Sequence, residues 1–113
     1  MIEVTLIDYI SHGLDVPCFA EEPAKPPASY CIIERTGTSE RNCITSATVA
    51  VQSYGGTLLE AMELNERLLK LMRRMPERGD ISRCALVSSY PFNDTTTKRY
   101  RFQAVYEITY FEE

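Results

Sequence analysis

The chain has 113 residues, of which 44% are hydrophobic and 25% charged, and its formal net charge is -4. This length suits one domain with one core and is too short for two. The acidic balance argues against a protein whose main task is to grip nucleic acid. No apolar run approaches the roughly 20 residues needed to cross a bilayer. The N-terminus is acidic where a signal peptide would be basic, so we expect one soluble domain, residues 1–113, that folds in a cytosol.

The first half of the chain predicts one short helix followed by three strands. The helix covers residues 2–12 and ends near Gly13. The predicted strands cover residues 16–19, 30–36 and 44–54, with a stiff proline-rich connector at 21–27 and a polar turn at 37–42. In the third strand Ala47, Val49 and Val51 share one face.

Residues 57–75 predict the helix around which the fold is organised. A wide apolar half of this helix suits packing against a sheet. That half carries Leu58, Ala61, Met62, Leu64, Leu68, Leu69, Leu71, Met72 and Met75. Thr57 and Glu60 have the spacing of a capping box, and Pro76 and Gly79 end the helix. Asn65 falls within the apolar half, so its amide needs a partner: the backbone of a strand or loop first, and a subunit contact next.

The last third of the chain predicts two more strands, at 81–90 and 100–111, separated by a polar loop at 91–99. The final strand alternates apolar and polar residues for most of its length, so one of its faces belongs in the core. The predicted fold class is therefore α+β, with the order α-β-β-β-α-β-β. We expect a mixed, mostly antiparallel sheet, with the long amphipathic helix packed on one face and a short N-terminal helix.

No residue pattern in the sequence indicates catalysis, a metal site or a cofactor. His12 is the single histidine and has no sequence-local catalytic partner. The four cysteines form no C-x-x-C pair and are expected to be reduced and mostly buried. An enzyme that uses Cys31 or Cys84 as nucleophile would be a third class of function, but no base is visible for either.

Basic and aromatic residues alternate in the stretch 93–102, which superficially resembles the signature strand of an RNA-recognition domain. That signature needs glycines that let bases approach, and none is present here. Tyr100 and Phe102 also share their face with Ala104 and Ile108, which favours burial. The alternative interpretation is a polar hairpin loop flanked by solvated charges.

Four runs of residues resemble the small tail-completion or tail-terminator proteins of long-tailed bacteriophages, which are common in prophages of Gram-positive bacteria. The runs are Glu34-Arg35-Thr36-Gly37, Ala47 with Val49-Ala50-Val51-Gln52-Ser53-Tyr54, Glu60-Ala61-Met62-Glu63-Leu64-Asn65-Glu66, and Asp94-Thr95-Thr96-Thr97-Lys98-Arg99-Tyr100-Arg101-Phe102-Gln103-Ala104-Val105-Tyr106. Together they span nearly the whole chain, and the last run is the most distinctive.

This resemblance implies a non-enzymatic virion structural protein that has no cofactor and no metal. Such a protein assembles as a ring, often a hexamer, at the head-proximal end of the tail. There it stops polymerisation of the tail tube and meets the head connector, so its partners are itself, tail-tube proteins and head-connector proteins. DNA would pass through the lumen without specific binding, and no membrane would be involved. The protein would reside in the virion, and in the host cytoplasm during assembly.

Polar loop residues that the fold does not require often carry interactions. We therefore predict contacts with subunits or partners at two loops and one aromatic residue. The predicted residues are Thr38, Ser39, Glu40, Arg41, Asn42, Tyr54, Asn93, Asp94, Thr95, Thr96, Thr97, Lys98 and Arg99. The alternative function is a small dimeric α+β domain that binds a metabolite or nucleic acid. Such a domain would expose an apolar pocket or a basic sheet face.

Overall fold

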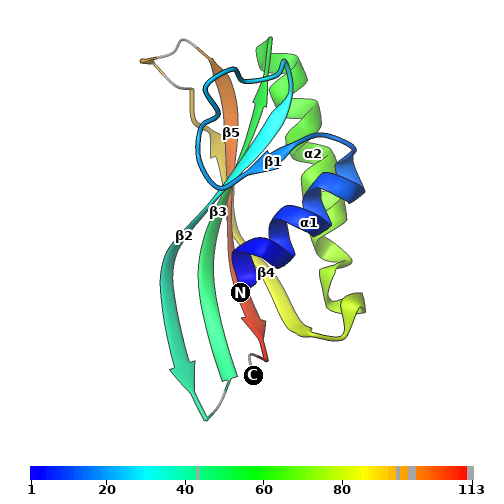
Figure 1. The fold of residues 1–113 in the computed structure, drawn as a ribbon, viewed down its shortest axis with the longest axis vertical. Helices are drawn as coiled ribbons and strands as arrows, with labels where there is room; N and C mark the ends of the chain where they lie inside the picture. The colour runs from blue at the N-terminus through cyan, green and yellow to red at the C-terminus, as the bar shows by residue number, and fades with distance from the viewer. Residues whose placement is uncertain (43, 94, 97–98, 112–113) are drawn as a thin grey trace.

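The computed structural model describes residues 1–42, 44–93, 95–96 and 99–111. The elements are α1 (Ile2–Leu14), β1 (Cys18–Phe19), β2 (Tyr30–Arg41), β3 (Ile44–Gly55), α2 (Leu58–Arg73), the 3-10 helix η1 (Met75–Arg78), β4 (Ile81–Pro91) and β5 (Tyr100–Tyr110). Figure 1 shows them along the chain. The predicted α+β class and the order α-β-β-β-α-β-β are confirmed.

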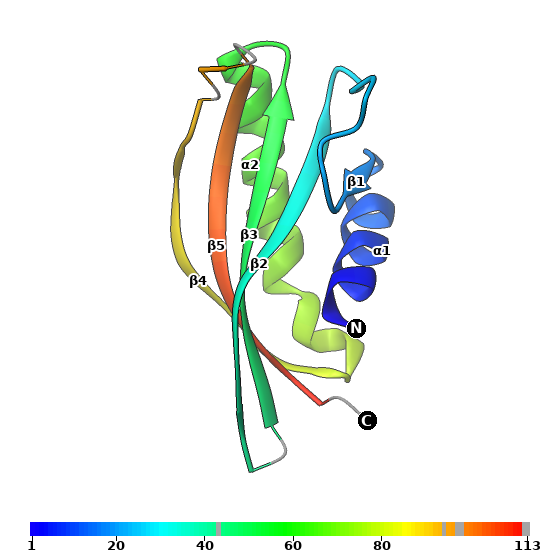
Figure 2. The same ribbon diagram turned by 60° about the vertical axis from the view of Figure 1, so that its left-hand side comes forward.

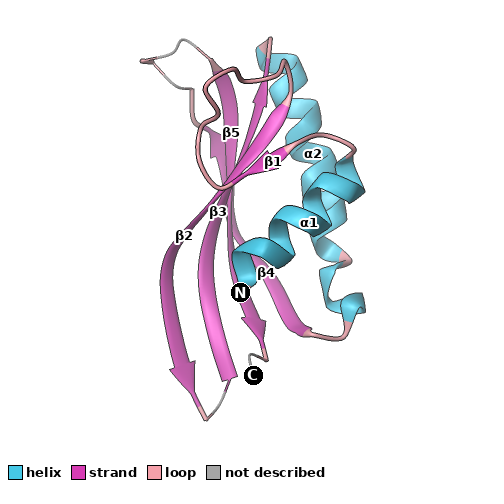
Figure 3. Cartoon of the chain, viewed as in Figure 1, coloured by secondary structure: helices cyan, strands magenta, loops and turns pink. Residues whose placement is uncertain are grey.

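All five strands belong to one sheet, in the order β1-β2-β3-β5-β4. The short β1 runs parallel to β2, and the other neighbouring pairs are antiparallel. The sheet is therefore mixed and mostly antiparallel, as predicted (Figure 3). Because β5 lies between β3 and β4 and is antiparallel to both, the two strands that α2 connects run in the same direction.

Both helices lie on one face of the sheet (Figure 2). Helix α2 packs mainly against β3 and β5, whereas α1 packs against β1, β2 and α2. Two hydrogen bonds tie the helices together: the Tyr9 hydroxyl donates to the Leu71 carbonyl over 2.8 Å, and Arg67 donates to the Leu14 carbonyl. The fold thus has a helical layer on one face and a second sheet face without helices.

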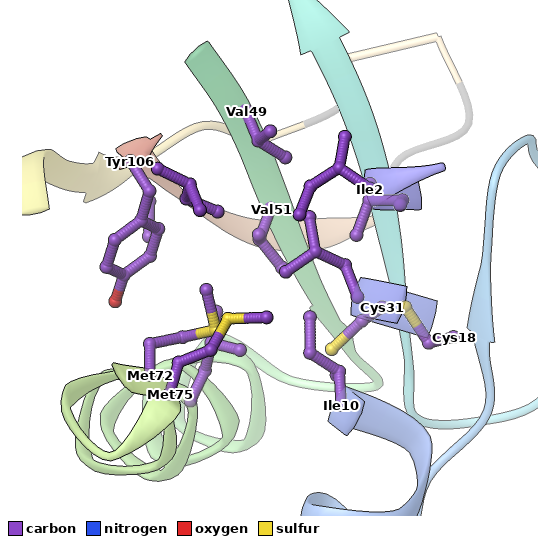
Figure 4. Close-up of a cluster of buried hydrophobic side chains, with 14 of the residues drawn as sticks. Ile2, Ile10, Cys18, Cys31, Val49, Val51, Met72, Met75 and Tyr106 are labelled. Atoms are coloured by element: carbon purple, nitrogen blue, oxygen red, sulfur yellow. The ribbon is translucent and has the colours of Figure 1, made fainter. Parts of the chain in front are cut away.

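The core lies between the helices and the sheet (Figure 4). It is filled by Ile2, Leu6, Ile10, Leu14, Cys18, Cys31, Ile33, Ala47, Val49, Val51, Leu64, Leu68, Met72, Met75, Ile81, Ala104, Tyr106, Ile108 and Tyr110. The alternating apolar residues of β5 from Ala104 onward are therefore buried, as expected, and the shared face of Ala47, Val49 and Val51 in β3 is buried as well. Tyr100, at the start of β5, is still 41% exposed.

The predicted capping pair forms at the start of α2, except that Glu60 accepts from the amide of Gly56 rather than from that of the N-cap residue Thr57. The Glu60 amide donates to Thr57 Oγ1 over 3.1 Å, and the Gly56 amide donates to Glu60 Oε2 over 3.0 Å. These bonds satisfy amides that have no partner within the helix. Gly55, just before them, is required because a side chain there would place Cβ 2.5 Å from the Ala61 backbone nitrogen.

The N-terminal helix is two residues longer than predicted, and Gly13 does not end it. Asp15 ends it instead, in the left-handed conformation with φ of 55°. Gly13 has a different role, because an added Cβ would lie 2.5 Å from the Leu71 side chain. The glycine therefore lets α1 approach α2 closely.

The polar stretch 37–42 was predicted to be a turn, and this prediction is wrong for most of its length. Strand β2 continues to Arg41, pairing with β3 until Arg41 faces Ile44. A register shift between Arg35 and Gly37 accommodates Thr36 as an extra residue. Only Asn42 remains in the turn, with φ of 53°, a conformation that asparagine tolerates. The polar residues of this stretch predicted a turn because the end of the hairpin buries no apolar face, so its sequence shows no alternating pattern.

Other boundaries shift by a few residues. Strand β1 is shorter than predicted and begins at Cys18, whereas β4 includes Pro91 as its last residue. Helix α2 ends at Arg73, and the 3-10 helix η1 carries Met75 and Pro76. The capped start of the helix was predictable, but its end was not.

Candidate functional site

The residues predicted to carry contacts form two groups at opposite ends of an elongated molecule (Figure 1). Thr38 to Arg41 form the exposed outer half of β2, and Asn42 follows in the turn. Tyr54 lies near the other end of the same hairpin, where it pairs with Tyr30 of β2 and Arg101 of β5. The structure therefore does not bring the two groups into one site.

The second loop lies at the Tyr54 end of the sheet. Asn93, Thr95 and Thr96 are exposed, whereas Arg99 lies over the Tyr30 ring. The predicted contacts Asp94, Thr97 and Lys98 lie outside the described residues. Of the described residues among these predicted contacts, Tyr54 and Arg99 therefore come together, through Tyr30.

The cluster around these residues, which we call the stacked cluster, consists of Tyr30, Tyr54, Phe92, Arg99 and Arg101. The Tyr30 and Tyr54 rings stack with centroids 4.4 Å apart and planes 8° apart. Arg101 lies 4.4 Å from the Phe92 centroid and 5.7 Å from that of Tyr54, while Arg99 lies 5.6 Å from that of Tyr30. Such cation–π contacts are worth about 0.5–2 kcal/mol each, so the cluster fastens the β4–β5 loop to the sheet.

A line of hydrogen bonds extends from the stacked cluster across the helix-free sheet face. Arg101 Nη1 donates to the Tyr54 hydroxyl over 2.7 Å, and that hydroxyl donates to Gln52 over 3.3 Å. Gln52 then donates to Gln103 over 3.0 Å, and Gln103 donates to the Tyr90 hydroxyl over 2.6 Å. The line joins β3, β5 and β4, so it holds the rings and guanidinium groups in fixed positions.

An open groove of about 700 Å³ lies beside the stacked cluster. Its floor includes Ile32, Gln52 and Tyr54, and Arg101 and Phe92 lie on one side. Three carboxylates line it as well, those of Glu21, Glu22 and Glu34. Glu22 accepts a 2.6 Å hydrogen bond from the Tyr30 hydroxyl. Burial and this bond raise the pKa of Tyr30, which keeps its hydroxyl protonated as a donor.

This arrangement is poorly suited to stacking nucleic-acid bases. Tyr30 and Tyr54 are buried, at 0% and 2% exposure, and their ring faces are occupied by each other and by arginines. The acidic lining would repel phosphates. Of the basic residues that suggested a nucleic-acid surface in the sequence, Arg99 and Arg101 pack on the rings of the stacked cluster.

Both outer edges of the sheet lack a strand partner over most of their length, as far as the described residues reach. Strand β1 pairs only with Cys31 and Ile32, so the outer edge of β2 is open from residue 33 to 41. Strand β4 lies at the other side of the sheet and pairs only with β5. Unpaired edges are templates for pairing with another chain, so these two edges are the candidate functional site.

The described cysteines are poor nucleophiles in this environment. Burial raises the pKa of Cys31 and of Cys84 to about 11, and the pKa of Cys18 to about 12. At neutral pH these thiols are protonated, whereas the thiolate is the reactive form. All three are free cysteines, and Cys43 lies outside the described residues.

His12 has a surface partner, whereas Asn65 has a partner for its amide nitrogen only. His12 Nδ1 lies 2.8 Å from the Asp8 carbonyl at the surface. Asn65 is 3% exposed and donates to Ser89 Oγ of β4 over 2.9 Å. Its partner is therefore a side chain rather than the backbone we expected, and its Oδ1 is buried without a hydrogen-bond partner among the described residues.

Three negative findings bear on the function. No group of three or more potential metal-ligating side chains occurs among the described residues. None of the described helices has the length and apolar character that crossing a membrane requires. The sequence matches no known family model, and no curated protein is significantly similar to it.

The sequence did not indicate the roles of the residues that hold the stacked cluster and its line of hydrogen bonds together. Arg101 was weighed as part of a nucleic-acid surface and of the polar half of a strand, Gln103 was interpreted as part of that polar half, and Tyr30 as a residue that favours a β-strand. Their interpretation needed the pairing of β3 with β2 and β5, which is a contact between distant segments. Strand β4 was predicted, but its place at the edge was not. The uncharged run from Cys84 to Tyr90 was the available signal for an edge that another chain pairs with.

Proposed function

We propose that this chain is a structural subunit of a bacteriophage virion, a tail-terminator, tail-completion or head–tail joining protein that assembles into a ring. The proposal starts from the four runs of residues that resemble such proteins along nearly the whole chain. Its work is done by protein–protein contacts, without a catalytic residue or a cofactor. Its site of action is the virion, after assembly in the host cytoplasm.

The observation that carries the proposal is the pair of open sheet edges, one on β2 and one on β4. A subunit with two different edges can contact two neighbours by the same interface repeated around an axis, and such heterologous contacts close into rings. A hexamer is the expected ring, with tail-tube and head-connector proteins stacked on its two sides. Both helices lie on one face of the sheet, so the other face is free of helices. That face would suit a lumen through which DNA passes without specific binding.

Electron microscopy and light scattering test the proposal on the purified chain. A hexameric ring would scatter as six copies of a 12.9 kDa chain and show a central hole. The second test adds the protein to the tail-tube protein that the same genome encodes, while that protein polymerises. We expect shorter tubes with rings at one end. Tubes of unchanged length, together with a monomeric protein at every concentration, would contradict the proposal.

The groove favours a second candidate function, a small dimeric α+β domain that binds a ligand. Its volume of about 700 Å³ is within the range of ligand sites, and it combines Arg101 with three carboxylates. Titration of the chain with an oligonucleotide and with metabolite mixtures, monitored by thermal shift, tests this function. Saturable binding by a strict dimer would favour it over the ring.

A further inference from the structure

The two open edges of the sheet run in opposite directions. Each step from β2 to β3, from β3 to β5 and from β5 to β4 is antiparallel, so β4 is antiparallel to β2 of the same chain. Copies that are related by rotation about an axis along the strands keep this relation. The β4 edge of one copy would therefore meet the β2 edge of the next as an antiparallel pair, the geometry with hydrogen bonds perpendicular to the strands.

The lengths of the two edges match. The open part of β2 covers residues 33–41, and β4 covers Ile81–Pro91. Register shifts next to Ser82 and Val87 interrupt the pairing of β4 with β5, and Arg83 is the one charged residue of β4. Each edge is thus long enough to add a full strand to the neighbouring sheet.

From Cys84 to Tyr90, strand β4 carries no charge and no proline, two of the features that keep a free edge from pairing; its two register shifts are the protective feature that it does have. Natural edges are protected by lysines, inward-pointing charges or prolines. Here no charged residue occurs between Arg83 and the final Pro91, and Leu86 and Val87 are 47% and 62% exposed. An exposed, uncharged edge of this kind fits a strand that is covered in the assembled protein.

The two helices cover different strands of the sheet. Helix α2 lies mainly over β3 and β5, so it covers little of β4, which is contacted more by η1. Met62 of α2 is 41% exposed. Helix α1 lies over β1 and β2, at the other side of the same layer. If β4 of one copy pairs with β2 of the next, the neighbour's α1 comes to lie on the same side of the joined sheet as α2.

We infer that the occupant of the β4 edge is the open β2 edge of a second copy of this chain, so that one continuous sheet runs through the assembly. The inference rests on the proposed ring and specifies its interface. It differs from a symmetric pairing of β4 with β4, which would give only dimers. The inference also explains why the outer half of β2 is polar: pairing through backbone hydrogen bonds requires no apolar side chains.

Val87→Lys tests the β4 side of this interface, because an edge lysine opposes strand addition. Leu59→Lys is the matched control, since Leu59 has the same exposure, 62%, but lies on the outer face of α2. Light scattering over a concentration series should show loss of the oligomer in Val87→Lys, with assembly shifted to roughly tenfold higher concentration or more. Leu59→Lys should assemble as the unmodified chain does.

Thr38→Pro and Ser39→Pro test the β2 side. Consecutive amides of a strand point to opposite sides, so one of these prolines removes a hydrogen bond to β3 and the other removes only an outward donor. Thermal melting identifies the outward one, because it leaves the midpoint nearly unchanged. That variant should lose the oligomer. When it is mixed with Val87→Lys, each retains one intact edge, so we expect one heterodimer and nothing larger.

The outcomes separate the interface from the function. If the unmodified chain forms rings and both edge variants do so as well, the edge pairing is wrong and the ring function stands. If Val87→Lys is monomeric but the outward β2 proline still dimerises, the contact is β4 with β4 and the inference is overturned. If the unmodified chain stays monomeric both alone and with the tail-tube protein, the interface and the proposed function both fail.

Discussion

The central strands β3 and β5 and the outer strands β2 and β4 belong to one sheet but have different surroundings. The central pair is hydrogen-bonded on both sides and has α2 on one face, and side chains such as Val49 and Ile108 are fully buried there. The outer half of β2 is exposed on both faces, and β4 exposes Leu86 and Val87. This difference indicates that the centre provides the stability of the subunit, whereas the edges are available for contacts with other chains.

The largest effect is expected from a cavity in the centre. Leu68 of α2 is 0% exposed, so Leu68→Ala should lower the free energy of unfolding by about 2–5 kcal/mol. Leu59→Ala removes a side chain of the same type that is 62% exposed and should cost less than about 0.5 kcal/mol. Chemical denaturation of both variants checks the contrast. Equal costs would show that α2 is not packed on the sheet by this face.

Two glycines give a matched test of the centre against the edge. A Cβ at Gly55 would lie 2.5 Å from a backbone nitrogen, whereas a Cβ at Gly37, on the outer half of β2, meets nothing within 4 Å. Gly55→Ala should therefore cost about 1–3 kcal/mol. Gly37→Ala should be neutral, or stabilising by up to about 1 kcal/mol through the unfolded chain. Thermal unfolding of the two variants measures the difference, and a destabilised Gly37→Ala would contradict the open edge.

A smaller effect is expected where the centre meets the β4 edge, at the hydrogen bond from Asn65 to Ser89. Asn65→Ala should lower the melting temperature, with a cost of about 1 kcal/mol, because it removes a buried donor and its bond. Ser89→Ala leaves the buried amide without this partner and should cost a similar amount. A double-mutant cycle isolates the pair. An unchanged thermal midpoint for Asn65→Ala would show that the amide is not buried and paired.

The effect that is smallest near neutral pH is a fall of stability at alkaline pH. Burial raises the pKa of Cys31 to about 11, above the value of about 8.5 expected in the unfolded chain. As pH rises past the lower value, the unfolded chain loses its proton first, so stability should fall until the pH passes the higher value. Thermal midpoints between pH 8 and 11 measure this fall, within the range that roughly spans the two pKa values. The fall should be smaller in Cys31→Ala; an identical fall would assign it to other groups.

The central elements were predictable from the sequence because each one encodes its own burial. The alternation of β5 from Ala104 to Tyr110, the shared face of β3 and the capping pair at Thr57 are local patterns, and all were confirmed. Residues 37–41 of β2 were predicted to be a turn because these polar residues show no pattern of burial. They are held as a strand by pairing with β3, a contact that no single segment specifies.

The candidate site was less predictable than the fold for the same reason. Tyr54 and Arg99 were singled out in the sequence, but not the stack that links them through Tyr30. The two open edges depend on the order of strands in the sheet, which the sequence does not specify locally. Apart from residues 38–41 at the end of β2, none of the edge residues was among the predicted contacts.

Hydrogen–deuterium exchange at low and high protein concentration tests the pairing of the edges most directly. In a free subunit the outward amides of β4 and of residues 33–41 face solvent, and those of β3 and β5 are protected. The account predicts that exchange in β4 and in the outer half of β2 slows together as the concentration rises, while exchange in β3 and β5 stays constant. Exchange in β4 and in the outer half of β2 that stays the same when the protein passes from monomer to oligomer would contradict it.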